Sequence, residues 1–133
     1  MIVHKQVPVN DLSLPELREI FLGERRFWAR ELTITLLTPP RGTREREVLL
    51  KKIYQQRSES QVQHYWVNKL FDDNAAQAFP KITDSHEMSA SLVRTIPGAI
   101  ALVPANRIPK GVKVLLIDGK KPGEAGYPLH SSG

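Results

Sequence analysis

The chain has 133 residues, a length that fits one domain and can bury one hydrophobic core. Its 41% apolar content is that of a globular protein, and the absence of cysteine excludes a disulfide framework, a thiolate zinc site and a cysteine nucleophile. The formal net charge of +5 favours an anionic partner, whether a phosphate group, nucleic acid or an acidic surface.

Neither a membrane span nor a secretory signal is visible in the sequence. No apolar run approaches the length of about 18 residues that spans a bilayer. The first residues, MIVHKQVPVNDL, lack the uninterrupted apolar core of a signal peptide. Either the protein stays inside the cell or an export signal once preceded Met1, and the sequence leaves both open.

The N-terminal part predicts a strand followed by a helix. Residues 2–9 alternate, with valines on one side and His4 and Gln6 on the other, which is typical of a half-buried strand. Ser13 and Glu16 form a capping box. Proline in the first turn and a glycine at position 23 then predict a helix over residues 13–23.

The next stretch predicts a basic loop, a buried strand and a second helix. The sequence ERRFWARE (24–31) is expected to be a loop with two aromatic residues, and the apolar run 32–37 a strand. Two prolines and Gly42 end that strand, and a helix opens near Thr43. The expected apolar stripe of this helix is Leu49, Leu50, Ile53 and Tyr54.

Two more helices and two strands are predicted after it. A helix starts near Ser58 or Ser60, with a core stripe of Val62, Tyr65, Trp66 and Leu70, and DDNAAQAF (72–79) is expected to be a loop. Asp84 and Glu87 form a second capping box for a helix that Gly98 closes. Strands are expected at 99–104 and 112–118, followed by a glycine- and proline-rich tail.

This order of elements predicts the fold class. Strands and helices alternate at the start of the chain, which indicates an α/β domain, a mixed sheet with helices packed on its faces. We expect one compact domain over residues 1–120 and a C-terminal strap or tail over residues 121–133.

The segment Arg41-Gly42-Thr43-Arg44 is the candidate ligand-binding site. The first N–H groups of a helix lack partners within the helix and lie at its positive end. Glycine allows a close approach, the Thr43 hydroxyl offers a further donor, and either arginine can hold two phosphate oxygens. The alternative is an ordinary capped helix, in which Thr43 is only the N-cap and two nearby acids, Glu45 and Glu47, repel a phosphate. Both interpretations stay open.

Four stretches in this order resemble one family: SLPELREIFLG, RGTREREVLLKKIY, RTIPGAIALVP and VKVLLIDGKKPGEAGYPL. They are similar to the phosphate-type substrate-binding proteins of ABC transporters, in particular to short relatives with the type 2 periplasmic-binding fold. The resemblance runs from about residue 5 to residue 129. It implies that this chain corresponds to one lobe of a two-lobed protein that holds an oxyanion in the cleft between its lobes.

The resemblance also implies a site. In this family a strand leads through a Gly-Thr turn into a helix, with an arginine or serine close by, and the matching positions are Arg41, Gly42 and Thr43. The serine expected before the glycine is Arg41 here, and Pro39-Pro40 replace the usual upstream acid. The glycine-rich loop of the first lobe has no counterpart.

The remaining candidates do not indicate an enzyme, a metal site or a cofactor. The four histidines show no metal-ligand spacing, and no nucleophile or phosphate-loop motif occurs. We expect Asp72-Asp73 to be a loop and not a catalytic pair. The basic aromatic stretch 24–31 has the composition of a single-strand nucleic-acid site, but we expect Phe27 and Trp28 to pack on the domain, so nucleic-acid binding is the least favoured hypothesis.

The leading hypothesis is non-catalytic binding of phosphate or a similar oxyanion, in an ABC importer or a related sensor, with a permease or sensor protein as partner. The resemblance implies a periplasmic or extracytoplasmic location, although the cytoplasm stays open. The alternative is an accessory interaction module that has lost ligand capture, which the missing loop favours, since a one-sided site leaves the ligand in water. A homodimer would rebuild the second wall.

Overall fold

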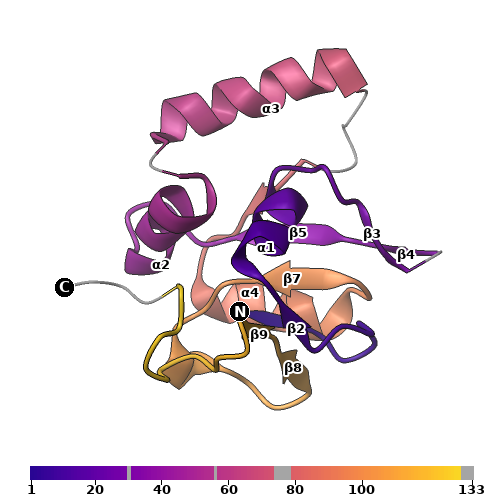
Figure 1. Ribbon diagram of the computed structural model, residues 1–133, viewed down its shortest axis with the longest axis vertical. Coiled ribbons are helices and arrows are strands. Elements are labelled where there is room, and N and C mark those ends of the chain that lie inside the picture. Colours follow the sequence, from indigo (N-terminus) through magenta and orange to yellow (C-terminus); the bar gives the residue numbers. More distant parts are fainter. Residues whose placement is uncertain (30, 56, 74–78, 130–133) are drawn as a thin grey trace.

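The computed structural model describes residues 1–29, 31–55, 57–73 and 79–129, and a five-stranded sheet runs through its centre (Figure 1). The strand order is β6-β5-β7-β1-β8. These strands are β1 (Ile2–His4), β5 (Thr35–Thr38), β6 (Lys81–Ile82), β7 (Ala99–Ala101) and β8 (Val112–Val114). Strand β5 runs parallel to β6 and β7, whereas β1 is antiparallel to β7 and β8, so the sheet is mixed as predicted.

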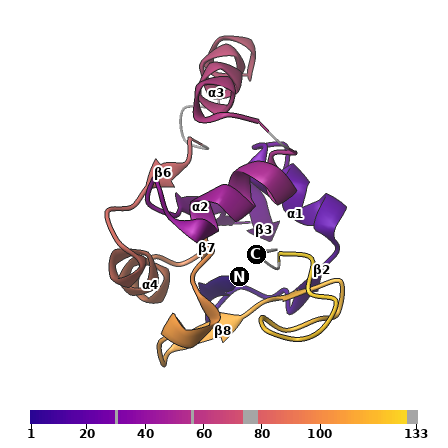
Figure 2. The same ribbon diagram turned by 90° about the vertical axis from the view of Figure 1, so that its left-hand side faces the viewer.

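Helices cover both faces of this sheet (Figure 2). Helix α4 (His86–Thr95) packs on one face over Ile2 and Leu37. Helix α1 (Leu14–Phe21) and the helix that begins as α2 (Arg44–Val48) contribute to the larger core on the other face. This arrangement confirms the predicted α/β class.

Strand β1 is shorter and more buried than the sequence suggests. The predicted strand 2–9 ends at His4, whose carbonyl accepts a hydrogen bond from the Val7 N–H at 3.0 Å. Ile2 packs toward α4 and Val3 toward the larger core, and His4 is only 5% exposed. The prediction of a half-exposed strand was wrong because β1 has a neighbouring strand on each side and a hydrophobic core on each face.

Helix α1 has the predicted capping box. The Glu16 N–H donates to the Ser13 hydroxyl, and the Ser13 N–H donates to the Glu16 carboxylate at 2.9 Å. Gly23 follows the helix with a φ of +75°, which glycine adopts without strain. Both predicted ends of this helix are confirmed.

The second helix changes geometry along its length. Thr43 is its N-cap, as predicted, and α2 continues into a π-helical segment, η1 (Leu49–Ile53). Leu49, Ile53 and Tyr54 are buried in the larger core, which confirms most of the predicted stripe. Leu50 is only partly buried at its edge.

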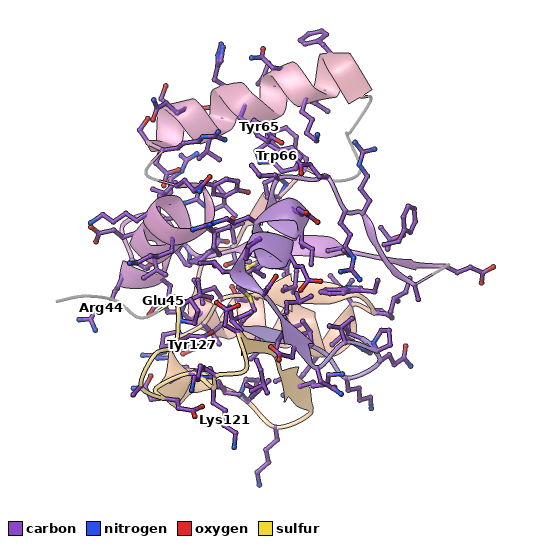
Figure 3. All side chains as sticks on the ribbon, viewed as in Figure 1. Arg44, Glu45, Tyr65, Trp66, Lys121 and Tyr127 are labelled. Atoms are coloured by element: carbon purple, nitrogen blue, oxygen red, sulfur yellow. The ribbon has the colours of Figure 1, made fainter. Side chains whose placement is uncertain are left out.

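Helix α3 (Glu59–Asp73) stands out from the body of the molecule and is attached through Val62 and two aromatic residues (Figures 1 and 3). Trp66 is 1% exposed, and its ring lies so close to Gly23 that a Cβ there would come within 2.6 Å of it. The Tyr65 hydroxyl donates to the Leu22 carbonyl at 2.6 Å. The helix therefore docks on the end of α1.

The predicted loop 72–79 is only partly a loop. Asp72 and Asp73 belong to the last turn of α3 and not to a connection, and residues 74–78 lie outside the described residues. Strand β6, which follows, was not predicted because two residues carry no periodic signal. Helix α4 starts one residue later than expected, since Ser85 and not Asp84 accepts the Met88 N–H, at 3.0 Å.

The stretch predicted as the basic loop 24–31 forms part of a hairpin instead. Strand β3 (Phe27–Ala29) pairs with β4 (Leu32–Thr33), so the predicted strand 32–37 splits between this hairpin and the main sheet. The indole N–H of Trp28 donates to the Gly98 carbonyl at 2.8 Å, and Trp28 is 5% exposed. Trp28 packs as expected, whereas Phe27 is 53% exposed.

The C-terminal part crosses back over the larger core. The predicted strand 112–118 divides into β8 and β9 (Leu116–Ile117), and β9 pairs in parallel with β2 (Asp11–Leu12). A short 3-10 turn, η3 (Ala105–Arg107), precedes them. The tail that follows is irregular, yet it places Tyr127 and Leu129 in the larger core.

Candidate functional site

The candidate site is the turn Arg41–Arg44 between β5 and α2. Its Thr43 hydroxyl donates to the Pro40 carbonyl at 2.7 Å and accepts the Arg46 N–H at 3.1 Å. This hydroxyl is therefore engaged by the protein's own backbone, and the extra donor expected from Thr43 is committed to the cap.

The backbone of the turn offers other donors. The backbone N–H groups of Gly42, Arg44 and Glu45 have no hydrogen-bond partner among the described residues, while that of Thr43 makes a long bond of 3.4 Å to Pro40. Gly42 has a φ of +82°, and a Cβ built on it meets no atom within 4 Å. A ligand can approach this backbone closely.

The two acids that would repel an anion are each held by a basic partner. Glu45 Oε1 lies 3.1 Å from His86 Nε2 of α4, and both side chains are largely buried. Glu47 Oε1 lies 2.6 Å from Lys51 Nζ, and this hydrogen bond lowers the pKa of Glu47. Neither carboxylate forms a hydrogen bond with the free amides of the turn.

The arginines of the segment differ in their surroundings. Arg46 donates two hydrogen bonds of 2.7 Å to Glu59, and its side chain is 6% exposed. These bonds lower the pKa of Glu59. Arg41 Nε lies 3.7 Å from the same carboxylate, and its side chain is 64% exposed. Arg44 is exposed and forms no ion pair within the described residues, so both Arg41 and Arg44 remain accessible to a ligand.

A cavity of about 520 Å³ lies beside the start of α2. Figure 3 shows Arg44 and Glu45 on the side of α2 that faces the C-terminal segment carrying Tyr127. The cavity is walled by the start of α2, by residues 102–106 after β7, and by residues 122–127 and 129 of the tail.

A second, smaller hollow of about 160 Å³ lies at Arg41 and Arg46, between the turn, α3 and the β6 edge. Its aromatic wall comes from Tyr54, Trp66 and Phe79. The candidate turn thus contributes to two neighbouring hollows, one on each flank.

Several features of the site had no signal in the sequence. The pairs Glu45–His86 and Arg46–Glu59 join residues 41 and 13 positions apart, and neither spacing is that of neighbours on one helix. The tail that walls the larger cavity has the composition of an irregular segment, which does not indicate where it packs. Only the tertiary fold brings these groups together.

The described residues hold no group of three or more acidic or histidine side chains placed for a metal ion. No helix among them is long and apolar enough to cross a membrane.

Comparison with known proteins gives structural matches only. No protein-family model matches the chain, and no curated protein matches it. The fold is similar to an ABC-type phosphate transport receptor from Vibrio cholerae, with a TM-score of 0.75 and 18% identity over 96% of this chain and 51% of that chain. It is also similar to PstS from Borrelia burgdorferi, with a TM-score of 0.67 and 12% identity over 91% of this chain and 47% of the other.

A third similar structure contains the anion. It is assigned as a phosphate ABC transporter substrate-binding protein from Clostridium perfringens, with bound phosphate, and it matches with a TM-score of 0.68 and 20% identity. The match covers 89% of this chain and 44% of that chain. The chain therefore has the fold of one lobe of a periplasmic binding protein, as predicted, and it spans about half the length of the structures it matches.

Proposed function

We propose that the protein binds a small phosphate-like oxyanion without catalysis, as a substrate-binding component of an ABC importer or as a related sensor. The anion would lie against the N–H groups of Gly42 and Arg44, with the guanidinium of Arg44 or Arg41 beside it. An ABC permease or a sensor protein would be the partner, in the periplasm or another extracytoplasmic compartment.

The observation that carries this proposal is that the amides of Gly42, Arg44 and Glu45 find no partner in the part of the chain that the structure describes. Unpaired N–H groups at a helix start attract anions, and glycine at the turn keeps the approach open. Glu45 and Glu47 are bound to His86 and Lys51, so the expected repulsion is reduced. The likeness to a structure with bound phosphate supports the same ligand class.

A titration of ¹⁵N-labelled protein with sodium phosphate at constant ionic strength tests the site. The largest amide shifts are expected at residues 42–45, with sodium chloride as the reference titration.

Arg44→Gln should weaken phosphate binding roughly tenfold, because a charge-assisted contact is lost. The matched control is Arg94→Gln, which removes an exposed arginine that lies on α4 instead of at the turn. It should change the affinity for phosphate less than about twofold. Absence of shifts at millimolar phosphate, or their concentration elsewhere, contradicts the proposal.

The second candidate function is an accessory interaction module. The chain spans about half the length of the structures it matches, and a one-sided site would leave the anion in water, where each charge contact is weaker. Saturating phosphate must raise the melting temperature if it binds the folded state. An unchanged melting temperature favours the accessory module. The molecular mass in solution, measured with and without phosphate, then shows whether a second copy completes the site.

A further inference from the structure

We propose that the 160 Å³ hollow between α3 and the β6 edge is a second binding site, for a small organic carboxylate that carries one ring. Its described lining combines an aromatic wall with guanidinium groups at one end. The site goes beyond the proposed oxyanion function and does not use the free amides of the turn, although Arg41 lies between the two places.

The wall of the hollow offers an apolar surface. The indole N–H of Trp66 donates to the Tyr54 hydroxyl at 3.4 Å, and that hydroxyl donates to the Phe21 carbonyl at 2.7 Å. The polar atoms of both aromatic residues are therefore used inside the protein. Trp66 and Tyr54 are only 1% and 2% exposed, so they form the floor of the hollow, and the accessible ring is that of Phe79, which is 42% exposed. The ring of Phe79 lies 5.6 Å from that of Trp66, tilted by 49°. A third flat ring packs well in such surroundings.

The charged end of the hollow is suited to one negative charge. Glu59 is bound through two hydrogen bonds to Arg46, so these charges balance. Arg41 lies 3.7 Å from Glu59, is 64% exposed, and adds a second positive charge that no further carboxylate neutralises among the described residues. The hollow thus has one guanidinium in excess. Guanidinium groups hold carboxylates in a planar, two-bonded geometry.

The apolar surface also extends to the rim. Val67, Phe79 and Ile82 line the hollow and are 39%, 42% and 37% exposed. Large apolar side chains left half-exposed around a concave, mostly apolar site are typical of ligand pockets. The volume of the hollow matches that of an engineered cavity of about 150 Å³ that accepts benzene, so one ring fits.

The test uses phenylacetate as the probe, benzyl alcohol as the ring without a charge, and acetate as the charge without a ring. Binding to the whole chain is measured by calorimetry and by amide shifts. Phenylacetate is expected to bind at least roughly tenfold tighter than either control, since only it uses both ends of the hollow. Equal affinity for all three, or no phenylacetate binding at about 10 mM, overturns the proposal.

Variants locate the site. Phe79→Ala should weaken phenylacetate binding about fivefold or more, since the ring loses one wall. Phe71→Ala, at a phenylalanine that is 85% exposed on α3 and outside the lining of the hollow, is the matched control and should leave affinity within about twofold. Equal effects of the two variants overturn the proposal. Val67→Glu, at an exposed rim position, keeps the test valid if Phe79→Ala unfolds, because the new carboxylate should repel the probe.

A phosphate titration of the same variants separates the two sites. Phe79→Ala and Val67→Glu should leave phosphate binding within about twofold if the anion lies at the amides of Gly42 and Arg44. Phenylacetate binding without phosphate binding supports the hollow and contradicts the proposed oxyanion function. Phosphate binding without phenylacetate binding contradicts only the hollow.

Discussion

The guanidinium of Arg46 donates two hydrogen bonds to the carboxylate of Glu59, each 2.7 Å long. This pair joins the helix that begins at the candidate turn to α3, which also packs on the body through Val62, Tyr65 and Trp66. The pair also forms one end of the small hollow. One contact therefore connects the stability of α3 to the shape of the small hollow beside the candidate turn.

Glu59→Gln should destabilise the protein by about 2 kcal/mol, because it leaves the buried Arg46 charge without its partner. The cost is below that of a fully buried pair, since Glu59 is 37% exposed. The pKa of Glu59 is lowered from its ordinary value of 4.5, so its contribution is present above that pH and is lost as the pH falls through the lower folded value. Urea unfolding at neutral pH and in acid measures both effects.

The matched control for this prediction is Glu47→Gln, which breaks the exposed pair with Lys51 on the surface of the second helix. It should leave the unfolding midpoint almost unchanged, because exposed pairs contribute little. Equal effects of the two substitutions would show that the Arg46–Glu59 pair is not a structural connection.

Gly98→Ala should be among the most damaging single substitutions in the chain. Gly98 has a φ of +86°, and a Cβ there would lie 2.0 Å from the Thr33 carbonyl oxygen. Its own carbonyl accepts hydrogen bonds from the Trp28 indole and the Thr35 N–H. We expect a loss of at least about 3 kcal/mol, from backbone strain together with displacement of the hairpin.

Gly123→Ala is the control that separates backbone strain from the steric clash with Thr33 in the Gly98→Ala experiment. Gly123 has a similar φ of +83°, but a Cβ there meets no atom within 4 Å. It should cost only about 1 kcal/mol, the usual penalty for a left-handed residue. If both glycine substitutions cost the same in thermal unfolding, the contact with Thr33 contributes nothing.

The parts of the fold that the sequence predicts are those whose signals are local. The capping box of Ser13 and Glu16 needs only neighbouring residues, and it is present as expected. Strand β6 and the split of β8 from β9 depend on pairing with distant strands, which local propensity does not encode. His4 was expected on a solvent face and is buried, because the partners of β1 lie near residues 101 and 113.

The candidate site likewise combines features that the local sequence predicts with features that depend on distant residues. The N-cap at Thr43 and the open glycine before it are local, and both are present. The carboxylates that seemed a difficulty for anion binding are held by His86 and Lys51, and only the second of these lies at a spacing that sequence alone predicts. The larger cavity depends on where the tail packs, and therefore on Tyr127 in the core.

The buried N-terminal amine predicts a pH dependence in a chain that begins at Met1. This amine donates to the Tyr127 hydroxyl at 2.9 Å, and burial lowers its pKa from 8.0 to about 5. Between these values the unfolded chain binds a proton that the folded chain does not, so the free energy of unfolding should rise with pH from about 5 to 8, by a few kcal/mol. N-terminal acetylation should remove this slope in urea unfolding, and a slope unchanged by acetylation would assign it to another group.

The contact between His86 and Glu45 predicts how the proposed anion site responds to mutation. His86→Ala frees the Glu45 carboxylate, which lies on the residue whose own N–H is one of the unpaired donors. A free negative charge at this place should weaken phosphate binding about threefold or more through repulsion. The double variant Glu45→Gln with His86→Ala removes that charge and should restore the affinity, which a simple loss of α4 packing would not allow. Calorimetric titration with phosphate distinguishes repulsion by Glu45 from a loss of packing, and circular dichroism confirms that the variants fold. A double variant that binds phosphate as weakly as His86→Ala alone would show that Glu45 has no electrostatic role.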